Sequence, residues 1–192
     1  VLYSLIPTPR VLVRNLDASL SRDRVQEVIR NTDLQKMTLG VFMLHYLLMS
    51  GFLVFPVLLI ATGEFDATDF SGVYLGLLVA TFVLMGPCMW LADRSDFAKG
   101  MLLGMIGLFA VSMLLFATVS STILVLASMM LFFMAFNLLE VIMPALLSRA
   151  APAGARGTAM GVYSTAQFAG AFAGGAVGGL ILSMGEITHL LY

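Results

Sequence analysis

Four long stretches of this sequence contain no Asp, Glu, Lys or Arg: residues 37–63, 70–92, 100–139 and 157–185. About 20 helical residues cross a bilayer core of about 30 Å, so three of the stretches each fit one crossing. The 40-residue stretch fits two crossings, with a turn at Ser120 and Ser121. Because the stretches are continuously apolar and do not alternate, helices are favoured over a β-barrel. We therefore predict an all-α integral membrane protein with five transmembrane helices, at about 38–61, 71–92, 100–118, 122–147 and 157–184.

The composition excludes most soluble classes of protein. Hydrophobic residues make up 60% of the chain and charged residues 11%, whereas soluble proteins carry about 25% charged residues. The net charge of −1 gives no case for nucleic-acid binding. No serine-hydrolase, zinc-protease or Walker A motif occurs, and Cys88 is the single cysteine. We therefore predict no enzymatic activity, no metal site and no cofactor.

The basic residues predict the orientation in the membrane. All ten lie in residues 1–36, in the turn after the second span or in the turn after the fourth, which five crossings place on one side. The opposite side carries acidic residues only: Glu64, Asp66, Asp69 and Glu186. The positive-inside rule then predicts a multi-pass membrane protein with residues 1–36 in the cytoplasm and Tyr192 outside.

Residues 1–36 are interpreted as a cytoplasmic linker that lies along the membrane surface. Pro7 and Pro9 break any early helix. Residues 21–31 predict a short amphipathic helix with Ser21 as its N-cap, and Asp33 is expected to cap the first span.

Small residues at four-residue spacing predict close helix packing. The fifth span has Gly170, Gly174 and Gly178 in one row, and the second has a weaker row with Gly72 and Gly76. Such rows let another helix approach closely. We expect both spans to be tightly packed, against partners that include helices outside this sequence.

Glu140 is the one ionisable carboxylate inside an apolar span, which makes it a functional candidate. One hypothesis is a proton-carrying acid. The other is an ion pair with Arg94 or Arg149 that holds a cytoplasmic gate, and the position of Glu140 toward the cytoplasm favours it. Asn137 lies one turn away on the same face.

Three further groups of polar residues are candidates. Asp93 and Arg94 form a charged turn, which is either a helix-capping element or an ordinary basic loop. His45, beside Tyr46 in the first span, faces a cavity or bonds a backbone carbonyl. Tyr163 and Gln167 share one face of the fifth span, where they line a pore or bridge two helices.

Two segments resemble the major facilitator superfamily. Leu91-Ala92-Asp93-Arg94 resembles the loop motif GxLaDRxGRK of that family. The stretch from Asn137-Leu138-Leu139-Glu140 through Pro144 to Gly157–Thr165 is similar to inner-membrane transport proteins of the same family.

The resemblance implies a fragment, with helices 7–11 of twelve in its C-terminal half; the last helix and the whole N-terminal half would be missing. It implies alternating-access transport, often as proton-coupled efflux, by a protein that is monomeric at full length. A lipid bilayer, protons and a small organic solute are the expected partners. The alternative is a membrane subunit that packs through its glycines and transports nothing. The expected cavity residues are His45, Tyr46, Phe52, Asn137, Tyr163 and Gln167.

Overall fold

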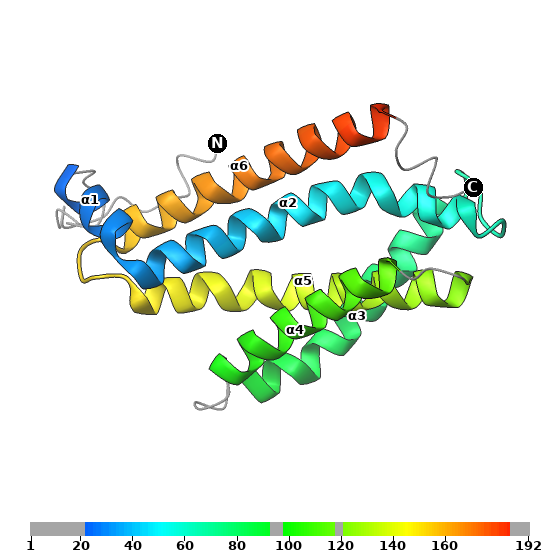
Figure 1. Ribbon diagram of the computed structural model, residues 1–192. Coiled ribbons are helices and arrows are strands. Elements are labelled where there is room, and N and C mark those ends of the chain that lie inside the picture. The colour runs from blue at the N-terminus through cyan, green and yellow to red at the C-terminus, as the bar shows by residue number, and fades with distance from the viewer. Residues whose placement is uncertain (1–21, 93–97, 118–120, 185–192) are drawn as a thin grey trace, which may run out of the picture.

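Every charge-poor stretch is helical in the computed structural model, which describes residues 22–92, 98–117 and 121–184 (Figure 1). The five long helices begin and end close to the predicted limits. The main differences are that α2 starts before residue 38 and α5 continues past residue 147. Within the described ranges no strand occurs, so the all-α fold is confirmed. The helices are α1 (Arg22–Arg30), α2 (Thr32–Ala61), α3 (Phe70–Ala92), α4 (Ala98–Phe116), α5 (Thr122–Ala150) and α6 (Arg156–Ser183).

Four helices are long and apolar enough to cross a membrane: α2, α3, α5 and α6. The apolar part of α4, Gly100–Phe116, is shorter. All 19 residues of α4 would extend about 28 Å, close to the thickness of a bilayer core. Large apolar side chains such as Phe82, Phe168 and Phe172 are exposed on the outside of the bundle. An apolar exterior of this kind suits lipid and not water.

Local sequence explains where the helices end. The side chain of Asn31 accepts hydrogen bonds from the backbone N–H groups of Asp33 and Leu34, so Asn31 caps α2. The expectation that Asp33 would be the cap is wrong, because Asp33 lies in the first turn of the helix. Gly63 and Gly154 follow α2 and α5 with positive φ angles of 75° and 83°, which favour glycine. The predicted cap Ser21 lies outside the described residues.

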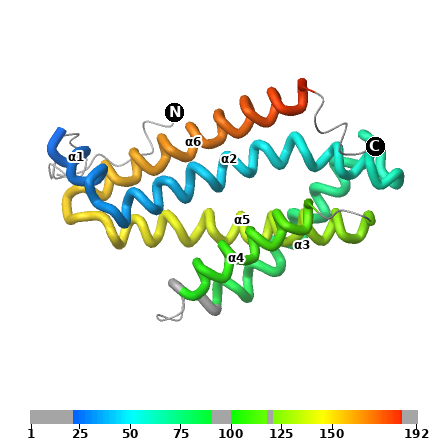
Figure 2. The backbone as a smooth tube through the Cα atoms, in the orientation of Figure 1, coloured from blue at the N-terminus to red at the C-terminus, as the bar shows by residue number. Residues whose placement is uncertain are grey.

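Helix α2 lies between α6 and α5, and α3 and α4 pack on α5 (Figures 1 and 2). At one end of the bundle, Arg24 of α1 donates a hydrogen bond to the carbonyl oxygen of Gly154 in the α5–α6 loop, at 2.9 Å. The α2–α3 loop with Asp66 lies at the other end (Figure 1). The chain therefore alternates between a basic end and an acidic end, the arrangement from which the orientation was predicted.

An aromatic cluster packs where α2, α4 and α5 meet. Phe55, Phe132 and Phe133 are buried, and the ring centroids of Phe55 and Phe132 are 5.1 Å apart. Phe109 and Phe116 of α4 contact the same rings at 4.8 Å and 5.1 Å. These edge-on and tilted contacts hold the three helices at the distance set by large side chains.

The contact between α2 and α6 is made by small residues and not by large aromatic ones. A Cβ atom on Gly170 would overlap the backbone carbonyl of Phe42, and one on Gly174 would overlap that of Tyr46. Gly178 lies against Leu53 and Ser50. We call this contact the glycine seam: Gly170, Gly174 and Gly178 of α6 against α2.

The second glycine row has no such partner. A Cβ atom on Gly72 or Gly76 of α3 would meet nothing within 4 Å among the described residues. Close packing of the second span against helices outside this sequence therefore stays a prediction. The glycine row of the fifth span is filled by the first span and not by helices outside the sequence.

Candidate polar site between three helices

His45 of α2, Glu140 of α5 and Gln167 of α6 meet in the interior of the bundle. The Gln167 Nε2 atom lies 2.9 Å from Glu140 Oε1 and 2.9 Å from His45 Nε2. His45 Nε2 also lies 3.7 Å from Glu140 Oε2. We call these three residues the polar triad. It is built by residues 45, 140 and 167, so it connects helices that are far apart in the sequence.

The hydrogen bonds of His45 define which ring nitrogen carries hydrogen. Its Nδ1 atom lies 3.2 Å from the backbone carbonyl oxygen of Val41. A carbonyl oxygen accepts only, so Nδ1 must be the donor. On the other side, the Gln167 amide has two N–H groups, one directed to Glu140 and one to His45 Nε2. His45 Nε2 is therefore an acceptor, and the ring in this geometry is neutral.

Two buried oxygen atoms near the triad lack a hydrogen-bond partner among the described residues, Glu140 Oε2 and the hydroxyl of Tyr163. Tyr163 is 2% exposed, and it is close enough to Glu140 for the two groups to interact electrostatically. The Phe136 ring lies edge-on to His45, with the centroids 5.5 Å apart. The Glu140 side chain is 33% exposed, with one carboxylate oxygen hydrogen-bonded and the other buried without a partner among the described residues, which is a costly state for a charged group.

Arg149 is one of the two partners predicted for Glu140, and pairing with the other, Arg94, stays a prediction. Arg149 is exposed and lies nine residues further along α5, about 13 Å along the helix axis. Among the described residues, the Glu140 carboxylate lies 3.7 Å from the neutral ring of His45, and no contact with Arg149 occurs. Asp93 and Arg94 lie outside the described residues.

The other candidate residues are dispersed around the triad. Asn137 donates to the hydroxyl of Thr81 on α3 at 3.4 Å. The Tyr46 ring stacks on Phe42, with centroids 6.5 Å apart. Phe52 is 42% exposed and contacts the rings of Tyr74 and Phe133.

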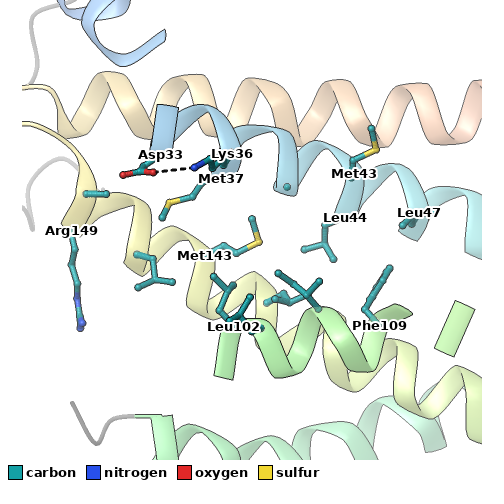
Figure 3. A pocket seen from close by; sticks show the side chains of 16 residues that line it. Asp33, Lys36, Met37, Met43, Leu44, Leu47, Leu102, Phe109, Met143 and Arg149 are labelled. Atoms are coloured by element: carbon teal, nitrogen blue, oxygen red, sulfur yellow. Dashed lines mark ion pairs between the residues drawn. The ribbon is translucent and has the colours of Figure 1, made fainter. Parts of the chain in front are cut away.

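A cavity of about 840 Å³ lies elsewhere, between α2, α4 and α5 (Figure 3). Its walls are apolar side chains such as Leu44, Phe109 and Met143, and its rim carries Arg149 and the ion pair of Asp33 with Lys36 at 3.6 Å. None of the six predicted cavity residues lines it. Polar groups that could orient a solute are therefore at the triad and not in this cavity.

Sequence reasoning named every member of the triad but did not place them together. His45 and Gln167 were both expected in the substrate cavity, whereas Glu140 belonged to a separate hypothesis, because spacing along one helix says nothing about neighbouring helices. Thr81, Phe136 and the Val41 carbonyl were missed, since their residue types are common in membrane helices. For Gln167, the prediction of a bridge between two helices describes the observed contacts.

Helices of this length and apolar character are those of a multi-pass membrane protein. The sequence model of the Major Facilitator Superfamily matches residues 38–191. The chain belongs to this family, as its motifs predicted.

Individual relatives agree with this assignment. The inner membrane transport protein YajR of Escherichia coli (strain K12) is 34% identical over 181 residues, which are 94% of this chain and 40% of the relative. An uncharacterized transporter of Buchnera aphidicola subsp. Baizongia pistaciae is 28% identical over 168 residues, 86% of this chain and 43% of the relative. The chain thus spans about two fifths of the length of the curated relatives it matches.

Family and relatives together indicate a transport protein and not an enzyme, as predicted. The chain is a multi-pass protein of the bacterial inner membrane.

Proposed function

We propose that the full-length protein is a secondary active transporter that exports a small organic solute in exchange for protons, by alternating access. The observation that carries this proposal is the placement of Glu140. Its described partners are a neutral histidine and an amide, so no arginine in the described residues holds its charge. A carboxylate in such surroundings is easily neutralised by a proton, because the protonated form avoids the cost of a buried charge.

The proposal also assigns the other parts of the transporter. Residues 1–36 serve as the cytoplasmic linker, and a further helix together with the N-terminal half completes the transport unit. The candidates for a cytoplasmic gate or coupling ion pair remain Glu140, Asp93, Arg94 and Arg149. The relatives support this scheme, since each is a transporter more than twice as long as the aligned segment.

The candidate cavity residues predict the class of solute. His45, Tyr46, Phe52, Asn137, Tyr163 and Gln167 bring aromatic rings and neutral polar groups, with Glu140 as the one nearby carboxylate. We propose that these residues line the solute path of the full-length protein, where they would suit an amphipathic or apolar solute and disfavour a strongly anionic one.

Transport in everted membrane vesicles tests the proposal. Vesicles that contain the full-length protein are loaded from outside with a panel of amphipathic fluorescent solutes, ethidium among them, with and without an imposed pH gradient. We expect accumulation of at least one solute that stops when the gradient is collapsed. Flux that continues unchanged after collapse would exclude proton exchange.

The alternative is a membrane subunit or assembly module that packs through its glycine faces and transports nothing. The matched family and relatives favour the transporter. The row on α6 is already filled by α2.

A further inference from the structure

The polar triad brings two atoms that can accept a proton close to each other. His45 Nε2 and Glu140 Oε2 face each other at 3.7 Å. His45 Nε2 is an acceptor because His45 carries its hydrogen on Nδ1, and Glu140 Oε2 is an acceptor whenever the carboxylate is charged. Two acceptors that face each other gain nothing from the contact, and Glu140 Oε2 is buried without a hydrogen bond. A single hydrogen between the two atoms would satisfy both.

Gln167 stabilises the empty form of this site. One of its N–H groups donates to the lone pair of His45 Nε2 and the other to Glu140 Oε1, each at 2.9 Å. The first bond requires an unprotonated Nε2, and the second is strongest when Glu140 is charged. Both bonds therefore oppose proton binding.

We propose that His45 and Glu140 together bind one proton, and that binding moves His45 from Gln167 on α6 to Glu140 on α5. The inference rests on the proposed function, since it assigns the proton of that exchange to a site. One proton from the aqueous phase forms one bond, to Nε2 or to Oε2, and no covalent bond breaks. The gap of 3.7 Å then closes to the length of a charged hydrogen bond, about 2.8 Å.

The consequence is an exchange of helix contacts. In the empty form His45 joins α2 to α6, and in the occupied form it joins α2 to α5, while Gln167 keeps its bond to Glu140. Helix α2 lies between these two neighbours (Figure 1). Proton binding would thus bias the position of α2 between α5 and α6, which gives alternating access a two-state element.

The other titratable groups on these helices do not supply the proton-binding pair. Tyr163 of α6 faces Glu140, and its hydroxyl has no hydrogen-bond partner among the described residues. Tyr46 stacks on Phe42. The remaining groups, Asp33, Lys36, Arg149 and Arg156, lie at the helix ends.

Solid-state NMR of the histidine ring nitrogens tests the proposal on the full-length protein in liposomes. The His45 signals are assigned by their loss in His45→Gln, and pH is varied without any solute. At high pH we expect the neutral ring with hydrogen on Nδ1. As pH falls, Nε2 should gain a hydrogen bond to the carboxylate.

A matched pair of variants makes the test specific. Gln167→Met keeps the size of the side chain but removes both donors, so the site should bind protons about tenfold more tightly and titrate at higher pH. Gln35→Met makes the same change at an exposed position of α2, where the amide bonds the Ile29 carbonyl, and should leave the titration unchanged.

Two results would overturn the proposal: hydrogen on Nε2 at high pH, or a titration that Gln167→Met does not move. Neither depends on solute flux. If the titration behaves as expected but transport ignores the pH gradient, the proposed function fails and not the proton site.

Discussion

Helices α3 and α6 carry the same sequence signal with opposite structural results. Both have glycines at four-residue spacing in apolar surroundings. On α6 the glycines let the backbone of α2 approach until no Cβ atom fits at Gly170 or Gly174. On α3 the space beside Gly72 and Gly76 is open among the described residues.

The difference teaches that a glycine row permits close approach but does not choose the partner. The pairing of α6 with α2 is accompanied by polar contacts across the glycine seam. The Ser50 hydroxyl donates to the Gly174 carbonyl at 3.2 Å, and Gln167 bonds His45. Helix α3 instead contacts α5 through Thr81 and Asn137, away from its glycines. In a bilayer, where apolar burial does not drive helices together, such hydrogen bonds and small residues decide the pairing.

Adding one methyl group to each helix should produce the largest contrast. Gly174→Ala forces a Cβ atom into the Tyr46 carbonyl, a backbone atom that cannot turn aside, and should lower stability by about 1–3 kcal/mol. Gly76→Ala adds the same atom to open space and should be neutral or slightly stabilising. Thermal unfolding of the two full-length variants in detergent measures the difference. Equal unfolding temperatures would mean that the seam is not closely packed in the whole protein.

Removing the hydrogen bond across the seam should have a smaller effect. Ser50→Ala deletes the donor to Gly174 while the helices remain in contact, and hydrogen bonds of this kind contribute about 0.6 kcal/mol on average. Ser183→Ala is the matched control, because its hydroxyl is exposed and bonds the Leu180 carbonyl within α6. The same unfolding assay should rank Ser50→Ala between Gly174→Ala and this control. A Ser50→Ala protein as stable as the control would show that packing alone sets the seam.

The smallest effect is expected in the loop that leads into α3. Asp66 accepts hydrogen bonds from the backbone N–H and the hydroxyl of Thr68, which hold the pKa of that carboxyl below its ordinary value of 3.8. A lowered pKa in the folded state means that the stabilisation is complete above about pH 4 and is lost as pH falls through the folded value. Hydrogen exchange of the Thr68 amide, corrected for its intrinsic rate, should accelerate over that range. In Asp66→Ala the amide should exchange quickly at every pH.

The sequence predicted the helices well because their signal is local. The charge-free stretches indicate directly which residues avoid water, and helices α2 to α6 coincide with them. The cap of α2 was assigned to Asp33 and not Asn31 because either residue type caps helices, and only backbone geometry separates neighbours so close in sequence.

The site was predicted less well because its signal is not local. Glu140 was identified from its cost in an apolar span, a property of one residue. Its partner depends on the order of the helices around it, and a single sequence does not contain that order. The prediction of an arginine partner followed from the position of Glu140 toward the cytoplasm, and for Arg94 it stays a prediction. Among the described residues, the contacts of Glu140 are with a neutral histidine and an amide.

The central claim is that Glu140 carries the proton that drives transport. The most direct measurement compares gradient-driven accumulation with solute exchange at equal pH, in proteoliposomes of wild type and Glu140→Gln. The solute is one that the wild-type protein accumulates. Solute exchange requires the substrate cavity and the conformational change of the protein, but no net proton movement. We therefore predict that Glu140→Gln loses gradient-driven accumulation and retains solute exchange. Accumulation that persists in Glu140→Gln would contradict the claim, and loss of both activities would assign Glu140 a structural role.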